Sequence, residues 1–164
     1  MLLNILLLII LVVSFVTDLK NRRILNIITF PTMAIGLTYH TITAGWAGFS
    51  FSGLGLLLGL GLLFIPYLLD GMGAGDVKLL AAIGALKGTA FVFGAFLFTA
   101  IIGGIIALMI LIGKKELLST LKRIIFFTKI KTLSGLDRSE YHHAFPYGVA
   151  IVLGTVTQLG VNIA

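Results

Sequence analysis

Two aspartates are the residues of this sequence best placed to carry out chemistry. The chain has only six acidic residues, and two of them stand at the boundaries of long apolar runs: Asp18 closes the first run, and Asp76, 58 positions later, opens another. An ionisable group within a membrane costs about 2.5–3.5 kcal/mol at the centre of a spanning helix, so it is a candidate for function. Two facing carboxylates in a restricted pocket do not both ionise easily. The ionised one can take a proton from water while the protonated one polarises a carbonyl group, which is chemistry suited to peptide hydrolysis.

Each aspartate also has a purely structural interpretation. Asp is a favoured N-cap, so Asp76 can simply cap the helix that follows it, and Asp18 can pair with Lys20 or Arg22. A glycine-rich stretch before Asp76 favours the catalytic interpretation, because glycine permits positive φ and the close approach of an extended peptide. Its glycines are Gly71, Gly73 and Gly75. We interpret the other acidic residues as an interfacial group, Asp70, and as solvated surface groups, Glu116, Asp137 and Glu140.

The composition identifies the environment in which these residues act. Of the 164 residues, 59% are hydrophobic and 11% are charged, and the mean hydropathy is +1.14. A soluble domain carries about 25% charged residues. The chain is therefore predicted to be a polytopic membrane protein, which excludes a cytosolic enzyme, a nucleic-acid-binding domain and a secreted disulfide scaffold. It has no cysteine, which excludes a disulfide, a thiolate nucleophile and a thiolate metal site.

Six apolar runs are predicted to cross the bilayer as helices, since a spanning helix needs about 20 mostly apolar residues. The runs are 1–17, 27–44, 47–69, two within 77–112, and 144–162, with a short outer turn at 45–50. A single helix over 77–112 would be about 54 Å long, too long for one crossing, and Lys87-Gly88 offers a break. In the third run, the spacing of Gly55 and Gly59 predicts close helix packing, the alternative being a flexible gate.

The basic residues set the orientation, because Lys and Arg collect in cytoplasmic loops. With two crossings in 77–112, eleven of the twelve basic residues face the cytoplasm and only Lys87 does not. Both termini are then outside, and both aspartates lie at the cytoplasmic boundary of the inner (cytoplasmic) membrane. The basic segment 114–131 is predicted to form an amphipathic interfacial helix between the fifth and sixth crossings. It would lie on an anionic leaflet, the alternative being a substrate-docking role.

No other pattern in the sequence predicts a reactive site. His142 and His143 are adjacent, so on a helix their side chains would point about 100° apart, and His40 lies far from them in the chain. We therefore expect no metal site, and the chemistry of the two aspartates needs no cofactor. The serines lack the sequence context of a nucleophile elbow, which argues against a serine hydrolase.

Two segments that contain the aspartates resemble the type IV prepilin peptidases, which are membrane aspartic peptidases of the G-x-G-D type. The first is T-D-L-K-N-R-R-I-L-N at 17–26, and the second is G-A-G-D-V-K-L-L-A-A-I-G at 73–84. The segment H-A-F-P-Y-G-V-A-I at 143–151 also looks like the start of that family's last helix. G-x-G-D alone is a weak motif, but its combination with six short-looped helices and an aspartate after the first helix is specific. The residues that support the motif are Asn26, Gly73, Gly75 and Lys78.

The resemblance implies that Asp18 and Asp76 are the catalytic pair of a single domain over 1–164. That domain would remove the basic leader from type IV prepilin-like precursors at the cytoplasmic face, with these precursors and the lipid bilayer as partners and no nucleic acid. Leu25 stands where the family often has proline before Asn26. Many members also carry a methyltransferase domain with paired cysteines. This chain has no cysteine and a short basic loop at 18–25, so it resembles the short, peptidase-only form that serves Flp (Tad) pili.

Two other classes of function are compatible with parts of this pattern. A small proton- or ion-coupled carrier can use the same two carboxylates, but carrier sites usually lie near the membrane midplane, whereas both aspartates are predicted at one face. A non-catalytic assembly factor would be expected to lack one of the aspartates, and this sequence has both.

Overall fold

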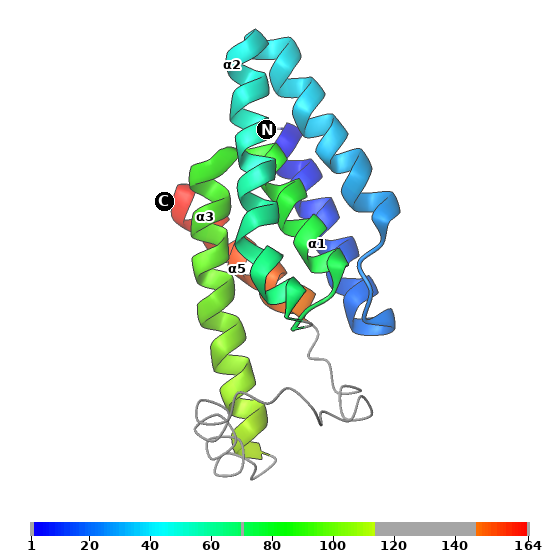
Figure 1. Ribbon diagram of the computed structural model, residues 1–164, viewed down its shortest axis with the longest axis vertical. Coiled ribbons are helices and arrows are strands. Elements are labelled where there is room, and N and C mark those ends of the chain that lie inside the picture. The colour runs from blue at the N-terminus through cyan, green and yellow to red at the C-terminus, as the bar shows by residue number, and fades with distance from the viewer. Residues whose placement is uncertain (1, 70, 114–146, 164) are drawn as a thin grey trace.

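The secondary structure of the described part of the chain is entirely helical. The computed structural model describes residues 2–69, 71–113 and 147–163. These residues form α1 (Leu2–Asn21), α2 (Asn26–Leu68), α3 (Ala74–Gly113) and α5 (Tyr147–Ile163), which pack side by side as a bundle (Figure 1). The predicted all-α class is confirmed for these residues.

Three of these helices are long and apolar enough to cross a membrane: α1, α2 and α3. The fourth, α5, is shorter and also apolar over Tyr147–Asn162. Many large apolar side chains on the outside of the bundle are exposed, which suits a lipid environment rather than water. The membrane character of the chain is thus supported, while the six crossings and their orientation remain predictions. The predicted interfacial helix at 114–131 and the start of the last run, 144–146, lie outside the described residues.

Both of the longest helices are broken at a glycine. A straight helix of 43 residues, the length of α2, would extend about 65 Å, roughly twice the thickness of the hydrocarbon core of a bilayer. Gly45 in α2 adopts φ 58° and ψ −136°, and Gly88 in α3 adopts φ 79° and ψ −179°. Residues with side chains rarely adopt such φ angles, so each break depends on glycine. At each break the helix doubles back on itself (Figure 1).

The two breaks test the sequence analysis in different ways. The predicted break at Lys87-Gly88 is confirmed. The predicted turn over 45–50 is wrong in extent, because the non-helical backbone is confined to Gly45 and the helix resumes at once. A single glycine at positive φ reverses the chain here, so no longer loop is needed.

The tightest packing joins the second half of α2 to the first half of α3. A Cβ atom added at Gly59 would lie 2.6 Å from the carbonyl oxygen of Leu80, and one added at Gly55 would overlap the carbonyl group of Gly84. The predicted close packing at Gly55 and Gly59 is therefore confirmed. The largest fully buried apolar side chains come from all four helices: Leu7, Leu11, Leu63, Leu79, Leu80, Ile83, Leu86, Val92 and Ile151.

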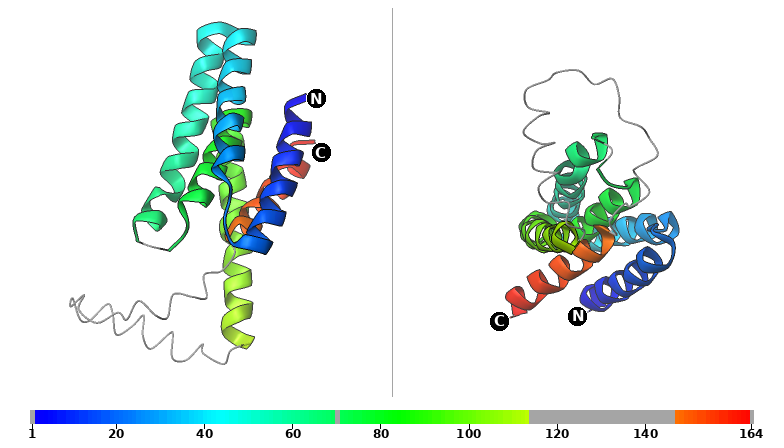
Figure 2. Two further views of the ribbon diagram at one scale, coloured as in Figure 1. Left: turned by 90° about the vertical axis from the view of Figure 1, so that its right-hand side faces the viewer. Right: turned by 90° about the horizontal axis from the view of Figure 1, so that it is seen from below.

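Several helix ends come together at one end of the bundle. The end of α1 and the starts of α3 and α5 lie toward the end of the bundle opposite the Gly45 break, and the linker after α1 rises from there to the start of α2 (Figures 1 and 2). The linker between α1 and α2 is short and crosses this end of the bundle. Residues near 18, 26, 76 and 148 are brought together in this way, although they are far apart in the sequence.

Candidate active site

Asp18 lies in the last turn of α1 and is only 4% exposed. Its Oδ2 atom accepts a hydrogen bond of 3.1 Å from the backbone amide of Val149, in the first turn of α5. The helix ends just beyond it, where Arg22 adopts φ 49° and its amide donates to the carbonyl oxygen of Asp18 at 2.8 Å. This bond comes from the backbone, and Arg22, one of the partners considered from the sequence, adds a favourable electrostatic interaction with the Asp18 carboxylate. The buried carboxylate is also held by the start of a helix, where amide groups favour negative charge.

Asp76 lies in the first turn of α3 and is 8% exposed. Its Oδ2 accepts a hydrogen bond of 3.2 Å from the amide of Gly73, and its own amide donates to the Gly73 carbonyl at 3.1 Å. This reciprocal pair resembles a capping box, in which Asp76 caps the helix from its third residue. The N-cap position considered for Asp76 is therefore wrong, because Gly73 precedes the helix and Asp76 lies within it. The predicted glycine loop at 71–75 is shorter than expected, because the helix already begins at Ala74. Capping uses one carboxylate oxygen, which leaves the other available for chemistry.

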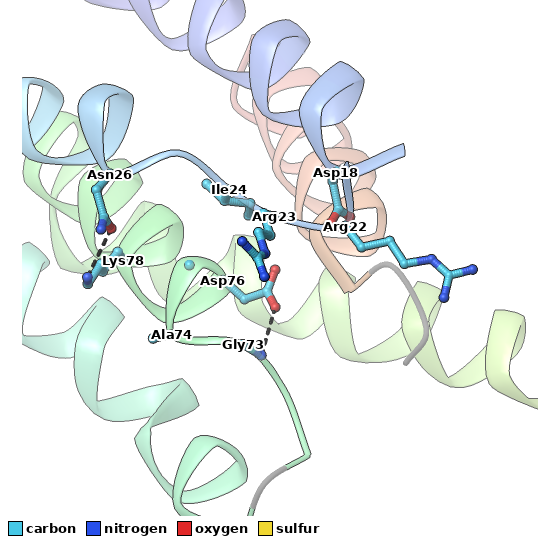
Figure 3. Close-up of a pocket in the computed structure, with 10 residues that line it drawn as sticks. Asp18, Arg22, Arg23, Ile24, Asn26, Gly73, Ala74, Asp76 and Lys78 are labelled. Atoms are coloured by element: carbon cyan, nitrogen blue, oxygen red, sulfur yellow. Dashed lines mark hydrogen bonds between the residues drawn. The ribbon is translucent and has the colours of Figure 1, made fainter. Parts of the chain in front are cut away.

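The two aspartates line one pocket of about 250 Å³ (Figure 3). They reach it from different helices, Asp18 from α1 and Asp76 from α3. Each water molecule in the liquid occupies about 30 Å³, so the pocket has room for several waters or for a short peptide segment. The other residues that line it are Arg22, Arg23, Ile24, Asn26, Gly73, Ala74, Gly75 and Lys78. Asp18 and Asp76 therefore line the same pocket, as expected from the sequence.

Gly75 allows the linker after α1 to close over the start of α3. A Cβ atom added at Gly75 would lie 3.0 Å from the Cβ atom of Ile24 and 3.2 Å from its carbonyl oxygen. Ile24 is buried and belongs to the apolar core. A side chain at position 75 would push this linker outward, and with it the residues on either side of Ile24 that line the pocket.

Asn26 and Lys78, the other two supporting residues expected from the sequence, bond to each other. The ammonium group of Lys78 donates to Oδ1 of Asn26 at 2.9 Å (Figure 3). It also lies 5.0 Å from the centre of the Phe30 ring. This pair ties the N-terminal part of α3 to the first residue of α2 beside the pocket. It thereby fixes the linker between Asp18 and Asn26 from its far end.

Cationic side chains lie close to the two carboxylates. Arg22, Arg23 and Lys78 all line the pocket, and in Figure 3 the Arg23 side chain points toward Asp76 while Arg22 points away from it. Nearby positive charge favours ionisation of a carboxyl group, whereas burial and a second carboxylate oppose it. The pocket thus combines opposing influences on two adjacent acids, an arrangement that can hold one proton between them.

The other residues considered from the sequence take no part in this pocket. His40 bonds through Nε2 to the carbonyl oxygen of Leu86 at 3.0 Å. The described residues contain no group of three or more His, Cys, Asp or Glu side chains that could hold a metal ion. The remaining histidines and acidic residues lie outside the described ranges: His142, His143, Asp70, Glu116, Asp137 and Glu140.

The sequence analysis missed the contribution of α5 to this site. The amide of Val149 reaches Asp18 across 131 positions of the chain. Its side chain plays no part in the bond, so the identity of the residue gives no signal. A weak signal lies in the preceding residue, Gly148, because a side chain there would collide with the Asp18 carboxylate.

These features define a class of protein: a helical membrane protein with two buried carboxylates, from separate helices, on one polar pocket. The comparison with protein families gives a more specific result. Residues 5–108 match the model of the type IV leader peptidase family, which is more than half of the chain and includes both aspartates. The chain belongs to this family, which confirms the resemblance found in the sequence and implies a peptidase. No curated protein and no solved structure matches the chain.

Proposed function

We propose that this protein is a membrane-embedded aspartic endopeptidase that removes the basic leader from type IV prepilin-like precursors. The observation that carries the proposal is the presence of Asp18 and Asp76 on the same pocket, although they come from different helices. The family supports a peptidase that acts on such leaders. The pocket supports the aspartic mechanism, because it supplies two carboxylates and room for both a water and a peptide bond.

In this mechanism the two carboxylates share one proton before reaction. The ionised aspartate takes a proton from the attacking water while the water oxygen bonds to the scissile carbonyl carbon. The protonated aspartate gives its proton to the carbonyl oxygen, which forms a neutral tetrahedral intermediate. Return of that proton, together with proton transfer to the departing nitrogen, breaks the C–N bond and releases a carboxylic acid and a free amine. The dyad titrates as a unit, so the roles belong to the pair.

The proposed orientation places the pocket at the cytoplasmic face. Cationic residues gather at this end of the bundle, on the α1–α2 linker and at the start of α3, as the positive-inside rule requires. At the opposite end, beside the Gly45 break, Trp46 is 79% exposed and stacks on Phe49, as aromatic residues do at a membrane surface. With six crossings, counted by dividing α2 and α3 at their glycine breaks, both termini lie outside.

The proposed substrates are precursors of the Flp (Tad) type. The linker between α1 and α2 spans only a few residues. In this respect the chain resembles the short, peptidase-only form that serves such pili. The scissile peptide would extend past Gly73 into the pocket, while the apolar segment of the precursor packs beside the bundle in the bilayer.

Cleavage of a co-expressed prepilin with a G-x-x-x-x-E junction tests this function. The wild-type protein should convert the precursor to a shorter product on a gel, and the Asp18→Asn and Asp76→Asn variants should not, while all three insert in the membrane at similar levels. If the inserted wild type cleaves none of several such precursors, the peptidase proposal fails. Proton or solute flux in liposomes would then test the carrier alternative.

A further inference from the structure

The start of α5 is packed directly on the carboxylate of Asp18. Val149 donates its amide hydrogen to Oδ2 of Asp18, and Gly148 beside it is buried. Hydrogen bonds to an ionised acceptor are stronger than those between neutral groups. One oxygen of this carboxylate is therefore fixed by backbone that comes from outside the region matched by the family model, residues 5–108.

Gly148 leaves no room for a side chain, and the obstacle is Asp18 itself. A Cβ atom added at Gly148 would lie 2.6 Å from Oδ2, 2.8 Å from Cγ and 3.2 Å from Cβ of Asp18. These are the three nearest atoms that it would meet. Other glycines of α5 differ: nothing lies within 4 Å of a Cβ atom at Gly160, and one at Gly154 would collide with Thr99 on α3.

We propose that Gly148 is a positioning residue for Asp18 and that its missing side chain lets α5 hold the carboxylate through the Val149 amide. The backbone of Gly148 and Val149 thus holds the Asp18 carboxylate on the pocket that it lines. This inference rests on the proposed peptidase function, in which Asp18 is one of the two reacting carboxylates. Gly148 acts through Asp18 and does not itself touch the substrate.

The test is the cleavage rate of purified Gly148→Ala in detergent with a prepilin substrate. The new methyl group displaces the end of one side chain, so the melting temperature should stay near that of the wild type. Loss of a hydrogen bond to a charged group should lower kcat by about 10- to 100-fold. KM should stay within about twofold, because the interaction does not bind the substrate. An unchanged kcat, or a change confined to KM, would overturn the proposal.

Two variants on the same helix serve as matched controls. Gly160→Ala should leave both kcat and the melting temperature unchanged, because a methyl group there enters open space. Gly154→Ala introduces a collision with Thr99 away from the pocket, so it should lower the melting temperature while the folded fraction keeps its kcat. If Gly154→Ala lowers kcat per folded molecule as much as Gly148→Ala does, the effect is general to α5 packing and the proposal fails.

A second comparison covers the outcome in which Gly148→Ala does not accumulate. The double variant Asp18→Ala/Gly148→Ala removes the two nearest atoms, Oδ2 and Cγ, and keeps only the Cβ contact at 3.2 Å, so it should accumulate at the level of Asp18→Ala alone. Failure of the double variant to accumulate would overturn the proposal. Failure of the wild type to cleave any precursor would instead count against the peptidase function, and the accumulation test would still decide the contact.

Discussion

Two regions of this protein place polar groups inside an apolar bundle, and they do so in opposite ways. One is the pocket that contains Asp18 and Asp76. The other is the break at Gly88, where polar side chains from three helices gather; we call these residues the Gly88 cluster, and they are Asn4, His40, Ser52 and Lys87. On composition alone, both regions qualify as candidate functional sites.

In the Gly88 cluster the polar groups pair with one another or with the backbone. Ser52 donates to the carbonyl oxygen of Ala85 at 2.7 Å, and His40 bonds to that of Leu86 at 3.0 Å. The helix break would otherwise leave these carbonyl groups without partners, which is costly in a lipid environment. Lys87, the one basic residue predicted on the outer side, donates to Oδ1 of Asn4 at 2.7 Å. The cluster thus completes the hydrogen bonding of an interrupted helix.

In the pocket, by contrast, the backbone bonds hold the carboxylates in place while the pocket stays open beside them. Asp18 and Asp76 each accept a backbone amide through Oδ2, and both line a space of about 250 Å³. A buried polar residue therefore indicates chemistry when it lines open space, and a structural role when hydrogen-bond partners fill its surroundings. Variants in the two regions should therefore change different quantities.

The largest effect is expected at the aspartate pair. Asp18→Asn and Asp76→Asn should each lower the cleavage rate by at least about 100-fold, because each removes an acid–base group. The double variant should be no slower than the slower single variant, since residues that act as one unit are not additive. The rates of the three variants on one precursor check this. Additive losses in the double variant would show that the carboxylates act separately.

Gly88→Ala should show the opposite behaviour, with a loss of stability and retained activity. The φ of 79° at Gly88 is strained for alanine, and a Cβ atom there would also meet the ring of Phe51, so the variant should lose about 1–3 kcal/mol of stability. Thermal melting in detergent measures the loss. Gly104→Ala, where a methyl group enters open space on the same helix, is the control and should melt like the wild type. A large fall in cleavage per folded Gly88→Ala molecule would remove the distinction between the two regions.

A smaller effect on activity is expected from the bond between Lys78 and Asn26. Lys78→Met removes the donor and keeps the apolar stem, so the linker beside the pocket loses one of its anchors. About 1 kcal/mol of lost positioning corresponds to about a fivefold lower cleavage rate. Lys20→Met, an exposed lysine outside the pocket lining, is the matched control for charge and should cleave at the wild-type rate. Equal losses from both lysine variants would indicate a general effect of charge.

The smallest expected effect is that of Ser52→Ala in the Gly88 cluster. Interhelical hydrogen bonds within membranes contribute about 0.6 kcal/mol on average, so the melting temperature should fall slightly and cleavage should not change. Ser50→Ala, half-buried on the same helix, is the control for loss of a hydroxyl group. A cleavage defect in Ser52→Ala with unchanged melting would assign a functional role to the cluster.

The sequence predicts much of this architecture because apolar runs and rare charges leave strong signals. The break at Gly88 could be predicted because a run of 36 residues is too long for one crossing, and because charge required a second one. Asp18 and Asp76 could be predicted as a pair because acidic residues are rare in this chain. The sequence could not predict that the first reversal is confined to Gly45. The residues after Gly45 are uncharged and mostly apolar, and such a sequence can form either a helix or a loop between two helices.

The part of the site formed by backbone was beyond the reach of sequence analysis. The bond from the amide of Val149 to Asp18 depends on how α5 packs against α1, and only the glycine at position 148 gives a weak sign of it in the sequence. A capping role for Asp76 could be predicted because Asp favours helix starts, but the sequence placed it before the helix rather than in the first turn. The start of α3 at Ala74, before Gly75, could not be predicted, because glycine-rich sequence is compatible with a loop as well as with the first turn of a helix.

The most direct test of the central claim compares purified wild type, Asp18→Asn, Asp76→Asn and Ser52→Ala for cleavage of one precursor and for thermal melting. The account predicts that both Asn variants melt near the wild-type temperature and cleave at least about 100-fold more slowly, while Ser52→Ala cleaves at the wild-type rate. A folded Asp18→Asn or Asp76→Asn protein that cleaves at a rate close to that of the wild type would contradict the claim that these two carboxylates perform the reaction.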